Sequence, residues 1–348
     1  MTKPTLLLLW LAMFAASGAF SACAENWPCW RGPRGDGTSA DRAITAWDGV
    51  TGDNIVWKTP IPGGGHASPI VWEDRVFQTT YLPDSNARTL LCIDRASGRT
   101  LWRKTVVISP EESKHDRNSY ASGTPATDGE LVFVTFLEVD GRATAPALNV
   151  SAPRMITPGK MVVAAYDFAG NQRWLIRPGD FVSVHGYCSC PVLFENLVIV
   201  NGDHDGDSYL VALDKSTGNV VWKTPRRHKT RSYVTPIIRR IDGQPRLVLS
   251  GSRCVAAFDP RDGKLLWSVD GPTEQFVASM VFDGDHFFVV GGYPTHHVMA
   301  IRPGGVGDVT QSHVAWHVRN AKSYVPSPVV VDDYLIVADD RGTAGCFA

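Results

Sequence analysis

An acidic run at residues 201–207 is the part of this sequence best suited to metal chemistry. It reads Asn-Gly-Asp-His-Asp-Gly-Asp, so Asp203, Asp205 and Asp207 alternate along it. Carboxylate oxygens at this spacing suit Ca²⁺ and are typical of the start of an EF-hand loop. The rest of that loop does not match, because its sixth position is serine and its twelfth is aspartate. Two interpretations follow, a weak calcium site or a polar turn between strands.

A second set of candidate binding residues recurs along the chain, shortly before a Pro or Met that opens a predicted strand. Five of its ten members are Tyr or Phe, and four others are polar or cationic residues close to these aromatics in the sequence. Aromatic rings beside cations in one concavity suit a ligand or a peptide. The alternative is that the tyrosines pack and cap strand ends. The candidates are His66, Asn118, Tyr120, His185, Tyr187, Arg231, Tyr233, Phe276, Lys322 and Tyr324.

The sequence contains no recognisable catalytic motif. His296 and His297 are adjacent, so in a strand they would point to opposite faces, and no H-E-x-x-H accompanies them. There is also no Gly-x-Ser-x-Gly elbow, phosphate loop or dinucleotide fingerprint. No residue is therefore assigned a catalytic role.

Charge and composition narrow the class of protein. The chain has 34 Lys and Arg against 35 Asp and Glu, a net charge of −1, which argues against a nucleic-acid partner. Its 32 Gly, 23 Pro and 11 Trp in 348 residues favour short strands, many turns and a repeated aromatic anchor. We therefore expect an all-β protein.

The strands that position the candidate residues belong to an internal repeat. A phrase at residues 92–102 returns at 212–222 and 257–267, with Asp, Gly and Trp in register. Shorter copies end at Trp174 and Trp316, and a half copy ends at Trp57. The repeated residues are Trp57, Trp102, Trp174, Trp222, Trp267 and Trp316, which are 45, 72, 48, 45 and 49 residues apart. This period is typical of a propeller blade, with an enlarged loop at 138–160 in the long step.

Each phrase predicts a hairpin between two strands of one blade. The Asp carboxylate accepts hydrogen bonds from turn amides, Gly supplies a positive φ, and the second strand carries the Trp, which wedges between adjacent blades. Two further strands precede each phrase, which predicts a β-propeller of four-stranded antiparallel blades, about six of them visible. The first strand of each blade lines the central channel, so the candidate binding residues should form a ring at one channel mouth.

The copy at 212–222 resembles the tryptophan-docking phrase A-x-D-x-x-T-G-x-x-x-W of the pyrroloquinoline-quinone-type (PQQ-like) propeller repeats and matches every fixed position. The resemblance covers the chain from about Trp57 onward. It includes two branches, the periplasmic quinoprotein dehydrogenases and non-enzymatic propellers similar to outer membrane protein assembly factor B. The opening at residues 27–37, Trp-Pro-Cys-Trp-Arg-Gly-Pro-Arg-Gly-Asp-Gly, also resembles the start of secreted planctomycete propeller proteins.

The dehydrogenase branch implies a PQQ cofactor with Ca²⁺ and an adjacent Cys-Cys pair, which this sequence lacks. We therefore expect no cofactor and a non-catalytic binding or assembly scaffold that uses the channel-mouth ring. Its partner, a protein or a small molecule, is not identified by the sequence, and we expect a monomer. The alternative is a divergent PQQ-dependent oxidoreductase that uses the acidic run for Ca²⁺ and the ring for the quinone.

Residues 1–24 read as a secretory signal peptide. One lysine precedes an apolar stretch of about 15 residues, shorter than the roughly 20 that span a bilayer, and an Ala-Cys-Ala pattern follows. An alternative is lipoprotein processing with lipidation of Cys23, which would add membrane contact. We expect export to the periplasm or cell envelope, an extension at 25–53 and the propeller at 54–348.

The last residues align with the third strand of a blade, before its turn and Trp. Either the chain is a truncated eight-bladed ring, or a first strand at 54–59 completes the last blade and closes a six-bladed ring, which leaves no unpaired edge. Cys92 and Cys346 fall at equivalent places in the repeat, where other copies have Ala. Both are predicted to be small buried thiols.

Overall fold

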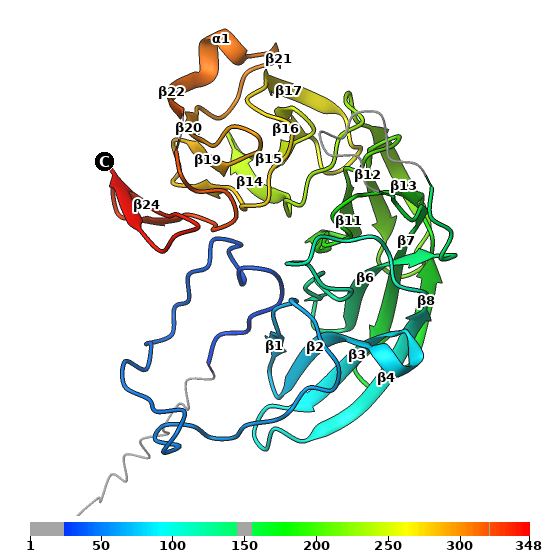
Figure 1. The fold of residues 1–348 in the computed structure, drawn as a ribbon. Helices are drawn as coiled ribbons and strands as arrows, with labels where there is room; N and C mark the ends of the chain where they lie inside the picture. Colours follow the sequence, from blue (N-terminus) through cyan, green and yellow to red (C-terminus); the bar gives the residue numbers. More distant parts are fainter. Residues whose placement is uncertain (1–23, 145–154, 320) are drawn as a thin grey trace, which may run out of the picture.

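The structure is a computed structural model that describes residues 24–144, 155–319 and 321–348. These residues are almost entirely β, with a short helix α1 (Thr310–His313) and a 3₁₀ turn at Pro83–Ser85. Their strands form six sheets that follow one another along the chain and stand around a common centre (Figure 1). The predicted all-β propeller is confirmed. The predicted signal peptide and Cys23 lie outside the described residues.

The six sheets have the following strands. The first sheet contains β1 (Ile70–Trp72), β2 (Arg75–Leu82), β3 (Ala87–Asp94) and β4 (Thr100–Ile108). The second contains β5 (Ala126–Thr127), β6 (Leu131–Val139), β7 (Gly159–Asp167) and β8 (Gln172–Ile176), with β9 (Asp180–Phe181) beside β7. The third contains β10 (Val192–Phe194), β11 (Leu197–Gly202), β12 (Tyr209–Asp214) and β13 (Val220–Pro225).

The other three sheets continue the series. The fourth contains β14 (Ile237–Ile241), β15 (Gln244–Gly251), β16 (Cys254–Phe258) and β17 (Leu265–Asp270), with β21 (Gly307–Asp308) beside β17. The fifth contains β18 (Val281–Phe282), β19 (Phe287–Gly291), β20 (His297–Ile301) and β22 (Val314–Arg319). The sixth contains β23 (Val329–Val331), β24 (Tyr334–Ala338) and β25 (Ala344–Phe347).

Each sheet is a blade whose main strands pair antiparallel in chain order. The first strand of a blade is innermost, since β1 contacts β5, β5 contacts β10 and β18 contacts β23. Because all innermost strands run in the same direction, their starts lie on one face of the propeller. The segments that lead into them therefore meet around one mouth of the channel.

Four tryptophans lie over the turn of the following blade, where the indole N–H donates to a backbone carbonyl. The pairs are Trp57 with Arg95 O (2.7 Å), Trp102 with Phe168 O (2.9 Å), Trp174 with Lys215 O (2.8 Å) and Trp222 with Pro260 O (3.1 Å). Under each ring lies the glycine of that turn. In the same order, these glycines are Gly98, Gly170, Gly218 and Gly263. A Cβ on any of these glycines would lie 2.5–2.9 Å from the indole, so the phrase requires glycine for space as well as for its positive φ.

The fifth blade replaces the tight turn with a longer path through β21 and α1. Strand β21 pairs in parallel with β17 and places Gly307 opposite Trp267. On the other side of this blade, Trp316 stacks on Phe347 of the sixth sheet, with ring centres 5.9 Å apart. The degenerate copy of the phrase therefore still places a tryptophan at each blade interface, although the backbone beside it differs.

The six-bladed ring closed by residues 54–59 is not formed in the described structure. These residues form no strand, and the sixth sheet has three strands there. Trp57 lies over the turn of the first blade, where the hydroxyl of Thr59 also donates to Gly98 O at 2.5 Å. The six sheets consequently form an arc with separated ends (Figure 1).

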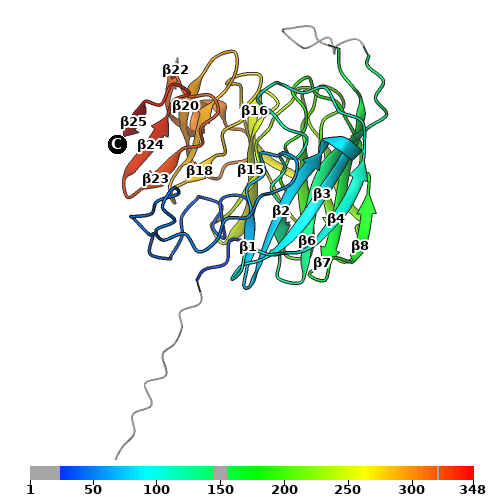
Figure 2. The same ribbon diagram turned by 60° about the horizontal axis from the view of Figure 1, so that its bottom comes forward.

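Residues 27–34 link the two ends of this arc across the channel (Figure 2). They hydrogen-bond to the innermost strands of five blades or to residues just before them. The contacts are Trp27 with Val71, Pro28 with Thr127, Trp30 with Ser279, Arg31 with Pro328 and Arg34 with Arg239. Residues 27–34 of the predicted N-terminal extension are therefore packed against the blades, whereas nearly all of residues 37–53 are exposed.

The six cysteines of the described residues are free thiols. Cys92 is buried opposite Trp102 of β4, and burial raises the pKa of its thiol to about 12. Cys346 is exposed, so the prediction of a second buried thiol is wrong. The reason is that no described strand lies beyond β25, whereas β4 covers the equivalent position in the first blade. No helix in the described part of the chain has the length and apolar character to cross a membrane.

Candidate functional site

Six segments surround the channel mouth, each leading into an innermost strand. We call residues 60–69, 109–125, 182–191, 226–236, 271–280 and 321–328 the mouth segments. Every residue of the predicted ring lies in one of them. The structure separates the ring residues into three kinds, according to whether they hydrogen-bond across segments, pack in the core or face solvent.

Three of the predicted residues join successive mouth segments by hydrogen bonds. The amide of Asn118 donates to the backbone carbonyl of His185 at 2.7 Å. The Nδ1 atom of His185 lies 2.9 Å from the phenolic oxygen of Tyr233, and the Ser183 hydroxyl lies 3.1 Å from the same oxygen. Burial raises the pKa of Tyr233 well above its ordinary value, so its phenol remains protonated. These side chains form a pre-organised, hydrogen-bonded rim.

Arg231 is the charged centre of the mouth. Its side chain is 2% exposed and contacts Asp205 at 2.8 Å and Glu274 at 3.3 Å. Burial alone would lower the pKa of Arg231, but Tyr233 and Asp205 hold it above its ordinary value. The guanidinium is therefore a permanent cation already matched by carboxylates, which holds two mouth segments to the acidic run.

On the other side of the mouth, the Gln275 amide donates to the phenolic oxygen of Tyr324 at 2.7 Å. The Tyr324 ring stacks on His296 with ring centres 5.6 Å apart, and burial raises the pKa of Tyr324 to about 12. The tyrosine thus connects the fifth and sixth blades. His296, which the sequence did not single out as a site residue, joins the rim here.

The remaining predicted residues divide by exposure. Tyr187 and Phe276 are buried and belong to hydrophobic clusters between blades. His66 and Lys322 are exposed at the mouth. These two are the only exposed residues among the ten of the predicted ring. The hydrogen-bonded members are partly or fully covered by neighbouring mouth segments.

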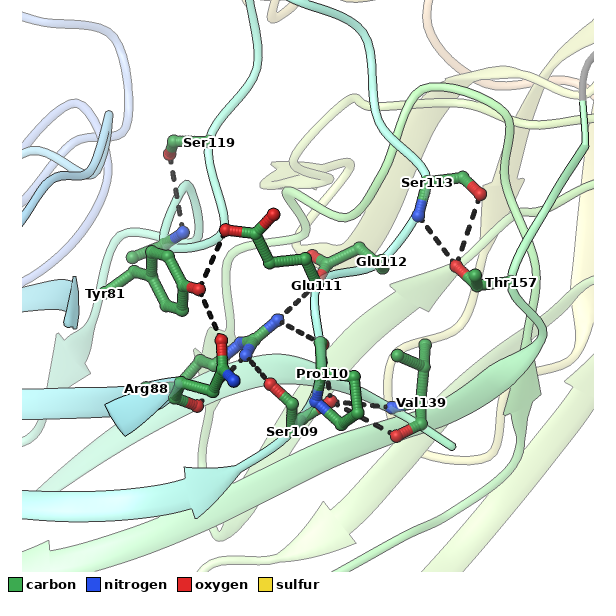
Figure 3. Close-up of polar contacts among 12 residues, drawn as sticks. Tyr81, Arg88, Ser109, Pro110, Glu111, Glu112, Ser113, Ser119, Val139 and Thr157 are labelled. Atoms are coloured by element: carbon green, nitrogen blue, oxygen red, sulfur yellow. Dashed lines mark hydrogen bonds and ion pairs between the residues drawn. The ribbon is translucent and has the colours of Figure 1, made fainter. Parts of the chain in front are cut away.

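Tyr120 contacts a largely buried polar cluster between the first and second blades, whose members Tyr81, Arg88, Glu111 and Glu112 are shown in Figure 3. Its ring meets Tyr81 edge to face at 4.7 Å, and the guanidinium of Arg88 lies 4.9 Å and 5.4 Å from the centres of the Tyr81 and Tyr120 rings. Arg88 forms a fully buried ion pair with Glu112, while Tyr81 donates to Glu111 at 2.9 Å. The sequence analysis missed this cluster.

Arg88 determines the path of the mouth segment 109–125. It donates to the backbone carbonyls of Asn86, Ser109 and Pro110 in addition to Glu112 (Figure 3). Burial raises the pKa of Glu112 to about 7, although the neighbouring guanidinium opposes this shift. An arginine in the third strand of the first blade was the signal available in the sequence, but its burial depends on the loop that folds over it.

The acidic run pairs with a basic segment rather than gathering around one point. Its three carboxylates contact three cations of residues 226–231. The pairs are Asp203 with Arg226 (2.9 Å), Asp205 with Arg231 (2.8 Å) and Asp207 with Lys229 (2.5 Å). Among the described residues, no group of three His, Cys, Asp or Glu side chains could hold a metal ion. The matching series of cations was visible in the sequence, but the sequence did not show that the two segments meet.

Two hollows lie beside the mouth on the same face. The first has a volume of about 590 Å³, and its charged lining residues are Glu138, Asp140, Asp180 and Lys160. The second, about 510 Å³, is lined mainly by residues of the basic segment and the end of β13. We call them the acidic hollow and the basic groove. The phenol of Tyr209, in the wall of the basic groove, donates to the backbone carbonyl of Asp180 at 3.1 Å.

A family model described as outer membrane protein assembly factor BamB matches residues 37–148 and 86–348. The chain belongs to this family. The predicted resemblance to PQQ-like propellers similar to this assembly factor is thereby confirmed.

Curated relatives carry the same name. Outer membrane protein assembly factor BamB of Burkholderia pseudomallei is 24% identical over 95% of this chain and 84% of its own length. The protein of that name from Bordetella pertussis is 27% identical over 65% of this chain and 58% of its own length.

Two solved structures share the fold. BamB from Moraxella catarrhalis has a TM-score of 0.53 at 15% identity, covering 83% of this chain and 73% of its own. A europium-containing methanol dehydrogenase has the same TM-score of 0.53 at 14% identity, covering 84% of this chain and 72% of its own. At these identities the likeness concerns the fold alone, so it does not distinguish a scaffold from an enzyme.

Proposed function

We propose that this chain is a non-catalytic scaffold in the assembly of outer membrane proteins, and that it holds a protein partner against its mouth segments. The observation that carries the proposal is the match to the assembly-factor family through most of the propeller, from residue 37 onward. The proposal includes export to the periplasm or cell envelope, where a factor of that name would act.

The geometry of the mouth supports binding of a partner. Asn118, His185 and Tyr233 connect three successive mouth segments, so the rim is ordered before a partner arrives. Pre-organisation lowers the entropy lost on binding. His66 and Lys322 are exposed on this rim and are available for contacts.

The charged groups of the mouth do not fit the quinoprotein alternative. A quinone held with Ca²⁺ needs several free oxygen ligands. Asp203 and Asp205 are buried and accept hydrogen bonds from Arg226 and Arg231, respectively. Binding of Asp203 to a metal would leave the buried Arg226 guanidinium without a carboxylate partner, and binding of Asp205 would leave Arg231 with Glu274 alone, so both changes are costly. We therefore propose that the protein functions without a quinone.

Photo-crosslinking in cells that naturally carry this chain tests the proposal. The photoreactive residue p-benzoylphenylalanine replaces Lys322 at the mouth or, as a control, Lys264 in an exposed turn at the opposite end of the fourth blade. We expect the mouth position alone to crosslink to an outer membrane β-barrel protein or to a component of its assembly machinery. Equal crosslinking of both positions, or of neither, would contradict the proposal.

A second measurement addresses the enzymatic alternative directly. The purified protein is titrated with PQQ in the presence of Ca²⁺ while quinone absorbance and dye-linked alcohol oxidation are followed. We expect neither saturable binding nor turnover. Calcium-dependent binding with turnover would overturn the scaffold proposal even if crosslinks were seen.

A further inference from the structure

The basic segment 226–231, which pairs with the acidic run, and the end of β13 before it contain both buried and exposed cations. Residues 223–231 read Lys-Thr-Pro-Arg-Arg-His-Lys-Thr-Arg. Arg226 and Arg231 are buried and matched by buried carboxylates. Lys223, Arg227 and Lys229 are instead exposed, and all three line the basic groove. The segment therefore has a structural half and a solvent-facing half.

The charge of the groove lining is unbalanced. Besides the three exposed cations, the lining contains Arg226, which Asp203 neutralises, and one exposed carboxylate, Asp207. Three exposed cations thus face one exposed acid in a chain whose net charge is −1. The adjoining acidic hollow has three carboxylates and one lysine in its lining, and these carboxylates pair with Arg177, Arg142 and Lys160. Of the two hollows, the basic groove is therefore the one whose lining attracts an anionic ligand.

The exposed ion pairs of the groove are easily exchanged. Arg227 lies 3.6 Å from Asp270, with the two side chains 70% and 54% exposed. The side chains of Lys229 and Asp207 are 70% and 88% exposed. Pairs this exposed contribute little to stability, so an incoming carboxylate can replace Asp207 or Asp270 with little effect on the fold.

One cation of the groove is held in place. The Lys223 ammonium lies 3.9 Å from the centre of the Tyr209 ring and donates to the backbone carbonyl of Pro178 at 2.8 Å. Its position at the wall of the groove is therefore defined before a ligand binds. The two more exposed cations, Arg227 and Lys229, have long side chains that can adjust to the spacing of acidic groups on the ligand.

We infer that the basic groove binds an acidic, extended segment of the protein partner, at the edge of the surface that the mouth segments form. Its cations come from one mouth segment, 226–236, and from the adjacent end of β13, so a partner on the rim reaches the groove directly. Charge complementarity identifies the chemistry of the segment as rich in Asp and Glu. The inference rests on the proposed function, which it extends by naming the chemistry of the partner.

Fluorescence anisotropy with a short fluorescein-labelled peptide rich in Asp and Glu tests this inference on the purified chain. The test variant combines Arg227→Glu and Lys229→Glu. The control combines Arg99→Glu and Lys264→Glu, which make the same charge change in exposed turns at the opposite end of the blades. The test variant loses two cations that would pair with acidic groups of the peptide. We therefore expect its affinity for the peptide to fall about tenfold or more, and the affinity of the control to change little.

Two further measurements make the test decisive. Peptide binding by the unaltered chain should weaken as salt is raised, because the groove is open to solvent. Vesicles containing phosphatidylglycerol should bind equally well to the test and control variants. Equal peptide affinity of the two variants, or vesicle binding lost only in the test variant, would overturn the inference. The crosslinking experiment at Lys322 reports separately on the proposed function, because it does not involve the groove.

Discussion

Substitution of Gly218 by alanine should disrupt the docking of Trp174 between the second and third blades. Gly218 has a φ of +74°, and a Cβ there would lie 2.7 Å from the indole. Trp174 is 8% exposed, and its N–H donates to Lys215 O at 2.8 Å. The substitution therefore combines an unfavourable backbone conformation with displacement of a buried ring.

The expected magnitude follows from these two contributions. A left-handed conformation costs alanine about 1 kcal/mol relative to glycine. Complete loss of a buried aromatic side chain costs about 3–5 kcal/mol, and a partial displacement costs less. We expect Gly218→Ala to lower the free energy of unfolding by about 2–4 kcal/mol. Gly342→Ala is the matched control, because Gly342 has a φ of +86° and no neighbouring atom within 4 Å of an added Cβ.

Guanidinium unfolding followed by far-ultraviolet circular dichroism measures both variants. The control should lose about 1 kcal/mol, so the difference between the variants isolates the contact with the indole. In addition, Gly218→Ala should cost less in a Trp174→Ala background, because the clash is then absent. Equal destabilisation of the two glycine variants, or additive effects with Trp174→Ala, would refute the docking argument.

Three other predictions follow from named contacts. Hydrogen bonds from the hydroxyls and amides of its turn lower the pKa of Asp214 to about 2, below the value in the unfolded chain. The stability that the ionised Asp214 contributes is therefore present above about pH 4 and is lost as the pH falls toward 2. In acid titrations of the free energy of unfolding, Asp214→Asn should lose less stability over this range than the unaltered protein. Arg31→Ala removes the hydrogen bond to the carbonyl before β23, and should increase hydrogen exchange in the sixth sheet but not in the third; unchanged exchange would contradict the role of residues 27–34 as a link. In the folded protein a maleimide reagent should label Cys346 rapidly and Cys92 only after unfolding, and rapid labelling of both would show that the first blade is not closed.

The sequence determined the blade architecture because the information is local. Asp214, Gly218 and Trp222 lie within one short phrase, and their spacing specifies a turn and the strand that follows it. Repetition of that phrase then predicts identical units that stack on one another, since a single blade cannot bury its own faces. The same locality explains why the turn glycines and docking tryptophans could be named before the structure was known.

Only the tertiary structure decided how deeply each candidate residue is buried and which groups it meets. Phe276 and Tyr324 each lie five residues before an innermost strand, yet Phe276 is buried between blades whereas Tyr324 is half-buried and bonds to Gln275 across the mouth. The carboxylates of the acidic run resembled a calcium loop until Arg226 and Arg231, some twenty residues further on, were placed against them. Burial and charge pairing depend on segments that are distant in the sequence and meet only when the blades pack, so the spacing of residues along one segment does not encode them.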